Sequence, residues 1–269
     1  MQSNTPVSDA AFSGNRRTEL GRTRTPDGDE LTLYRAGDVY VIRCNGWELM
    51  SSRAPRSEQA LARVGCGGGF PSERPTILVG GLGMGYTLRA TLDLAPAAAR
   101  IVVAELVPEV VEWNHGFLGA LSGHPLSDPR VELYHGDVAH LIAQAEATFD
   151  VVLCDVDNGP EAVIYQQNNF LYSARGLARM RHTLAPHGTL AVWSADRSPN
   201  FETGLHEAGF DWRAVEIAVG AVGSKVAHTI YVARRGELPR SARVEAREAQ
   251  GQEQAVWAPV VRASGAAMD

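Results

Sequence analysis

Residues 77–85 read ILVGGLGMG, a short apolar run that passes directly into a string of glycines. Residues 86–94 then show helical apolar spacing and stop before Pro96. A strand that turns through glycines into a helix is the characteristic first unit of doubly wound α/β domains. Glycines let the backbone turn tightly and approach a ligand, and the helix N-terminus offers unpaired N–H groups to it. Structural turns also produce such strings, so the motif alone does not establish a binding site.

Further strands and helices alternate on the carboxyl side of this unit. Apolar runs predict strands, and the segments between them have helical spacing; the strands are 101–104, 131–134, 151–154 and 190–193, and the helices 108–121, 138–147 and 173–184. Such alternation indicates a parallel sheet covered on both faces. Two closing strands, 213–219 and 227–233, are joined by a short connection, which makes them antiparallel neighbours. We therefore predict an α/β fold with a doubly wound, seven-stranded, mostly parallel sheet and an antiparallel last strand.

A smaller β-rich region precedes the α/β pattern. Two short strands, 31–34 and 39–44, are bounded by turn signals such as Asn45-Gly46, which favours tight hairpins. A helix is expected over 57–64. The predicted organisation is a flexible tail (1–18), a small antiparallel β-appendage (19–69), the α/β domain (74–236) and a second flexible tail (237–269).

Composition narrows the class of protein. The chain has 269 residues, a net charge of -6 and three cysteines without metal-ligand spacing. A net negative charge argues against a surface that binds nucleic acid, because phosphate binding needs a positive electrostatic potential. The polar N-terminus lacks a signal-peptide core, and no apolar stretch reaches 18 residues. We expect a cytoplasmic protein with no membrane or nucleic-acid partner and no metal site.

Acidic residues follow three further strands. Glu105 ends the second strand, Asp137 follows the third, and Asp155 and Asp157 follow the fourth. Ligands of open α/β sheets bind beyond the carboxyl ends of the strands, where a carboxylate accepts hydrogen bonds from ribose hydroxyls. Each residue also has a simpler interpretation: Glu105 as a solvated carboxylate, Asp137 as a helix N-cap, and Asp157 as a loop cap. Four signals at successive strand ends favour a nucleoside site.

This set of motifs resembles the class I adenosylmethionine-dependent methyltransferase fold and, more narrowly, the spermidine synthase family. The resemblance covers about 19–235 and includes the β-appendage, the Asp-x-Asp…Gly-Pro loop at 155–160 and the stretch from 169 to 188. It implies that Glu105 holds the ribose, Asp137 the adenine, and Asp155 and Asp157 the acceptor and the sulfonium. It also implies a homodimer. The glycines that would bracket the methionine and ribose portion are Gly80, Gly81, Gly83 and Gly85.

Three departures from that family affect the predicted reaction. The family has an acidic residue in the glycine loop, where this chain has Leu82-Gly83-Met84, so the carboxylate of ordinary adenosylmethionine is not repelled. The segment 57–63 lacks the family's Tyr and second Glu, and Arg63 has the wrong sign for a cationic acceptor. The loop at 155–160 is shorter, which leaves open whether Asp155 or Asp157 is catalytic.

The preferred prediction is methyl transfer from S-adenosyl-L-methionine to a small-molecule acceptor such as an amine. Asp157, with Asp155 as the alternate, would bind the acceptor and remove its proton. One alternative is aminopropyl transfer from decarboxylated adenosylmethionine, as in spermidine synthases; another is a non-catalytic nucleoside-binding module. Tyr165, Tyr172 and Trp193 are candidates to line the acceptor pocket, whereas we interpret His228 as structural.

Overall fold

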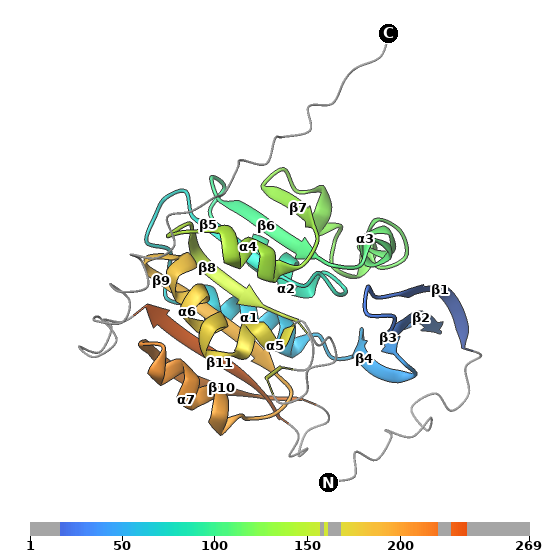
Figure 1. The fold of residues 1–269 in the computed structure, drawn as a ribbon. Helices are drawn as coiled ribbons and strands as arrows, with labels where there is room; N and C mark the ends of the chain where they lie inside the picture. Colours follow the sequence, from blue (N-terminus) through green and yellow to red (C-terminus); the bar gives the residue numbers. More distant parts are fainter. Residues whose placement is uncertain (1–16, 157–158, 161–167, 220–226, 236–269) are drawn as a thin grey trace. The chain divides into compact units, whose positions relative to one another are not determined.

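The computed structural model describes residues 17–156, 159–160, 168–219 and 227–235. Its larger sheet has seven strands in the order β10-β11-β9-β8-β5-β6-β7 (Figure 1). Strands β7, β6, β5, β8 and β9 are mutually parallel, and β11 is antiparallel to both β9 and β10. The predicted sheet is therefore confirmed. The strands are β5 (Thr76–Gly80), β6 (Arg100–Glu105), β7 (Val131–His135), β8 (Phe149–Cys154), β9 (Leu184–Ser194), β10 (Phe210–Ala218) and β11 (Ala227–Arg235).

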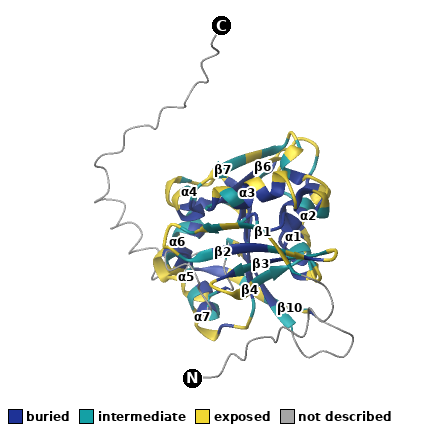
Figure 2. Cartoon of the chain, turned by 90° about the vertical axis from the view of Figure 1, so that its right-hand side faces the viewer, coloured by how far each residue is buried: buried dark blue, intermediate teal, exposed yellow. Residues whose placement is uncertain are grey.

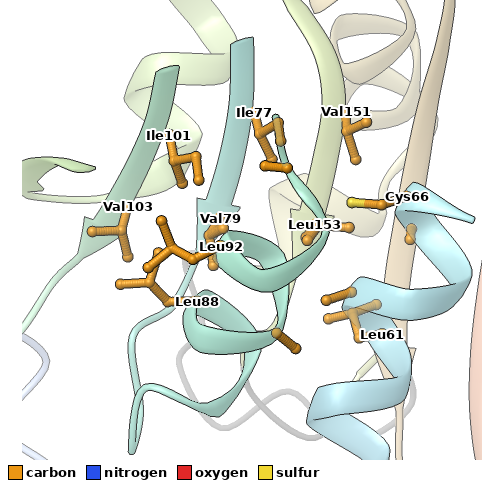
Figure 3. Packing of buried hydrophobic residues seen from close by; sticks show 14 of the residues in the cluster. Leu61, Cys66, Ile77, Val79, Leu88, Leu92, Ile101, Val103, Val151 and Leu153 are labelled. Carbon is orange, nitrogen blue, oxygen red and sulfur yellow. The ribbon is translucent and has the colours of Figure 1, made fainter. Parts of the chain in front are cut away.

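Helices cover both faces of this sheet because its strands are apolar on both sides. Ile77 and Val79 pack with α1 and α2, as Figure 3 shows, whereas Leu78 between them packs with the helices of the other face. This alternation is the reason for the continuous apolar runs in the sequence. The helices are α1 (Arg56–Cys66), α2 (Tyr86–Leu94), α3 (Pro108–His115), α4 (Val138–Gln144), α5 (Asn169–Tyr172), α6 (Ala174–Thr183) and α7 (Pro199–Glu207), with 3-10 turns at Gly119–Leu121 and Pro125–Ser127.

The β-rich N-terminal region forms a separate antiparallel sheet. Its four strands pair in chain order: β1 (Thr18–Arg24), β2 (Glu30–Ala36), β3 (Val39–Cys44) and β4 (Trp47–Ser51). Leu33 and Ile42 on its inner side are buried in one cluster with Met84 of the glycine loop and Trp113 of α3. Figure 2 shows the buried stretch of β2 that includes Leu33. This packing holds the small sheet against the glycine loop.

Some predicted boundaries were wrong. The helix expected over 108–121 ends at His115, because the backbone leaves the helical conformation at Gly116. The helix expected over 138–147 ends at Gln144, because Ala145 is extended. The strand expected over 190–193 begins earlier, at Leu184, and includes His187 at a φ of 65°. In the part of the chain that the structure describes, no helix is both long and apolar enough to cross a membrane.

Candidate active site

The glycine loop between β5 and α2 approaches other backbone segments closely. Gly81 has a φ of 89°, and a Cβ placed there would collide with the backbone carbonyl of Asp155. At Gly83 a Cβ would lie 2.6 Å from Met50 Cε of the small sheet. Gly85, with a φ of 80°, precedes the first residue of α2. Positive φ values with no room for a side chain require glycine, so the loop sits directly between the two sheets.

Glu105 at the end of β6 is hydrogen-bonded to this loop. One carboxylate oxygen accepts from the Leu82 backbone N–H at 3.0 Å, and the other accepts from the Val107 N–H at 2.9 Å. Burial raises the pKa of Glu105, and these backbone donors oppose that rise. The side chain is 9% exposed and borders a cavity. Its carboxylate oxygens retain lone pairs that can accept hydrogen bonds from two adjacent hydroxyls.

Asp137 is the N-cap of α4. Its Oδ1 accepts from the Ala139 backbone N–H at 2.8 Å, which confirms the capping interpretation. The residue also lines the same cavity as Glu105, beside Gly136. One oxygen therefore caps the helix, and the second can accept from a ligand amine.

Asp155 lies after β8, where the negative charge of Glu58 acts on it; both residues are half-buried. Thr87 of α2 donates its hydroxyl to Asp155 Oδ2 at 2.5 Å. Burial raises the pKa of Asp155 to about 7, the negative charge of Glu58 adds to the rise, and the Thr87 hydrogen bond opposes it. Burial likewise raises the pKa of Glu58. Two carboxyl groups that resist joint ionisation are able to hold or transfer a proton near neutral pH. Asp157 and Tyr165 lie outside the described residues.

These groups surround one cavity of about 550 Å³, which is lined by the glycine loop, strand ends of the large sheet and residues of the small sheet. Among the described residues that line it, seven are Asp or Glu and none is Lys or Arg. Such a lining creates a negative potential that attracts cations and disfavours anions. The seven are Asp29, Glu48, Glu58, Glu105, Asp137, Asp155 and Asp196.

Several lining residues were not predicted from the sequence. Asp196 follows β9, so the rule applied to the other strand ends would have identified it. Glu58 lies in the segment judged to have lost acceptor-binding residues, and His228 was interpreted as structural; both line the cavity. Arg63 is exposed and is not a lining residue, so the objection drawn from its charge does not apply. Trp193 lines the cavity as predicted, whereas Tyr172 is not among the lining residues.

The family model of the spermine/spermidine synthase domain matches residues 64–205, more than half of the chain. The chain belongs to the spermine/spermidine synthase family. Members of the family are transferases, so the prediction of a transferase is confirmed. The matched residues include the glycine loop and the ends of β6, β7, β8 and β9.

Solved structures agree on the fold. Spermidine synthase from Thermotoga maritima is 16% identical with a TM-score of 0.64, and the alignment covers 83% of this chain and 74% of that one. A spermidine synthase in complex with the transition-state analogue AdoDATO is 18% identical with a TM-score of 0.67, covering 83% and 75%. A probable spermidine synthase from Corynebacterium glutamicum is 20% identical with a TM-score of 0.59, covering 87% and 88%. A comparison with curated proteins found no match.

Proposed function

We propose that this protein transfers an aminopropyl group from decarboxylated adenosylmethionine to a small amine acceptor. The observation that carries this proposal is the charge of the cavity: seven carboxyl groups and no Lys or Arg among its described lining residues. Decarboxylated adenosylmethionine and an amine acceptor are both cationic and fit such a lining. The carboxylate of ordinary adenosylmethionine would meet no Lys or Arg side chain among those described residues. Family membership supports the same reaction.

The residues around the cavity fit the nucleoside of this substrate. Glu105 offers two carboxylate oxygens whose positions are set by backbone N–H groups of Leu82 and Val107. We assign the ribose hydroxyls to it, and the adenine amine to the second oxygen of Asp137. Gly81 and Gly83 line the cavity, so we assign the rest of the substrate to the backbone of this loop.

Asp155 is the proposed general base. An amine acceptor is protonated near neutral pH, since alkyl amines have pKa values of about 10, and it must lose a proton before it can attack. A carboxylate with a pKa of about 7 is a stronger base than an ordinary aspartate. The proton moves to Asp155, and the amine nitrogen then forms a bond to the carbon attached to sulfur. The C–S bond breaks, and its electron pair stays on sulfur as a neutral thioether. When bound, the substrate supplies the electrophilic carbon and this leaving group.

Methyl transfer from adenosylmethionine is the second candidate. It is favoured by the loop sequence Leu82-Gly83-Met84, which lacks the acidic residue of the family. In the structure, however, Leu82 and Met84 are buried in the core, and other carboxylates line the cavity. The missing loop residue therefore does not make the cavity receptive to a carboxylate, and this candidate ranks below aminopropyl transfer.

In the decisive experiment the purified protein is incubated with each nucleoside and a panel of mono-, di- and triamines. Liquid chromatography would separate methylthioadenosine, the by-product of aminopropyl transfer, from S-adenosylhomocysteine, the by-product of methyl transfer. We expect methylthioadenosine to form from decarboxylated adenosylmethionine, and its formation to fall by about 100-fold or more in Asp155→Asn. Asp38→Asn, an exposed carboxyl group in the small sheet's β2–β3 turn, is the matched control. Formation of S-adenosylhomocysteine instead would establish methyl transfer. Binding of both nucleosides with no product from any amine would favour a non-catalytic role.

A further inference from the structure

Three polar side chains form a hydrogen-bonded row along one wall of the cavity. Ser57 Oγ donates to Glu58 Oε2 at 2.7 Å, and Ser57 Oγ also lies 3.1 Å from His228 Nδ1. Ser57 and Glu58 lie in the first turn of α1, and His228 is the second residue of β11, 171 residues away from Ser57 in sequence. All three residues line the cavity, and Ser57 is 1% exposed.

The single hydroxyl hydrogen of Ser57 in this hydrogen-bonded row defines the tautomer of His228. A serine hydroxyl has one hydrogen, and Ser57 gives it to the Glu58 carboxylate. Ser57 Oγ can therefore only accept from the imidazole, so Nδ1 of His228 carries the hydrogen. In a neutral ring the other nitrogen, Nε2, then has a lone pair and acts as a hydrogen-bond acceptor. Within the described part of the chain, the structure records no hydrogen-bond partner for Nε2.

The surroundings keep the imidazole neutral and in place. Burial lowers the pKa of His228, and the charge of Asp196 opposes this without reversing it. Trp193 packs edge-to-face on the ring, with centroids 4.7 Å apart. The charged groups on neighbouring elements are Glu58 on α1, Asp155 after β8 and Asp196 after β9. The ring is thus an uncharged acceptor among carboxylates.

We propose that His228 is an acceptor-binding residue: Ser57 and Glu58 hold its Nδ1–H tautomer, so that Nε2 accepts a hydrogen bond from an ammonium group of the amine substrate. This inference rests on the proposed function, because it assumes that an amine enters the cavity. In a diamine only the attacking nitrogen must be neutral, and the second one stays protonated. We assign that second ammonium group to His228 Nε2, which makes His228 a determinant of selectivity for diamines over monoamines.

The matched variants separate this role from a structural one. His228→Asn retains an N–H that can reach Ser57 but has no counterpart of Nε2. Ser57→Ala retains the imidazole but removes the group that fixes its tautomer. Thr229→Ser, a buried neighbour on β11, is the control for disturbance of the strand. Circular dichroism and thermal melting would establish that each variant is folded.

Two measurements at pH 8 test the proposal without requiring turnover. Nitrogen-15 NMR of histidine-labelled protein reads the tautomer, and calorimetry on protein saturated with methylthioadenosine compares 1,4-diaminobutane with butylamine. We expect the Nδ1–H form in the wild type and a shift towards Nε2–H in Ser57→Ala. We also expect His228→Asn to weaken diamine binding about tenfold or more, because the variant loses a hydrogen bond to a charged group, while butylamine binding changes little.

Three results would overturn the proposal: an Nε2–H tautomer in the wild type, undiminished diamine binding in His228→Asn, or equal losses for both amines in that variant. Equal losses would show that His228 only supports the wall of the cavity. Failure of the proposed function is distinguishable from these, because it would show as amine binding with the expected tautomer but no aminopropyl product from any amine.

Discussion

Replacement of Asp155 by Asn should stabilise the protein at neutral and alkaline pH while abolishing its activity. Burial raises the pKa of Asp155 from 3.8 to about 7, with a further contribution from Glu58. Between about pH 4 and pH 7 the folded protein keeps a proton that the unfolded chain has lost. The free energy of unfolding must then fall by about 1.4 kcal/mol per pH unit, to a total of roughly 4 kcal/mol above pH 7.

Asp155→Asn removes this pH dependence of the free energy of unfolding and changes little else. Asn has nearly the same volume, and its carbonyl oxygen can still accept from the Thr87 hydroxyl, which lies 2.5 Å from Asp155 Oδ2. We therefore expect the stability of the variant relative to wild type to rise between pH 4 and pH 8, by up to about 4 kcal/mol. Below pH 4 the two proteins should be about equally stable, because Asp155 is then protonated in both the folded and the unfolded states.

Urea unfolding at pH 4, 5, 6, 7 and 8, followed by the fluorescence of the five tryptophans, measures this difference directly. Asp38→Asn removes a carboxyl group that is fully exposed and serves as the control for charge loss. If the difference between Asp155→Asn and wild type stayed constant across this pH range, the carboxyl group would not be destabilised by burial, and its assignment as a base near neutral pH would fail.

Three further predictions concern the same cavity. Gly81→Ala places a side chain at a φ of 89° against the Asp155 carbonyl, so the free loop should relax away from the conformation that lines the cavity. Ligand binding must then restore a left-handed conformation that costs about 1–2 kcal/mol, and calorimetry should show methylthioadenosine binding weakened by about five- to thirtyfold. Glu105→Gln puts an amide N–H against a backbone donor; we expect a loss of about 1–3 kcal/mol in urea unfolding and weaker nucleoside binding, and unchanged values would contradict the assignment of Glu105. Thr87→Val removes a hydrogen bond that lowers the pKa of Asp155, so the rise of the reaction rate with pH should move to higher pH; a profile shifted to lower pH would refute this.

The order of elements and the glycine loop could be read from local sequence. Apolar runs such as 77–79 and 151–154 predict buried strands, because each strand has helices on both faces and needs apolar side chains on both. The strand-end residues Glu105, Asp137 and Asp155 could likewise be predicted, since parallel strands bring their carboxyl ends to one edge. The helix ends were less predictable, because one residue such as Gly116 or Ala145 ends a helix whose apolar spacing continues.

The composition of the cavity depended on tertiary contacts. Strand β11 lies between β9 and β10, and this brings His228 to Ser57, 171 residues away in sequence. Glu58 raises the pKa of Asp155 only because α1 packs on the large sheet. The local sequence of α1 does not encode that packing. Sequence patterns report the periodicity and the ends of single elements, so they predicted the nucleoside side of the site. The sign and strength of its electric field required the positions of residues from both sheets, and that field is the basis for preferring a cationic substrate.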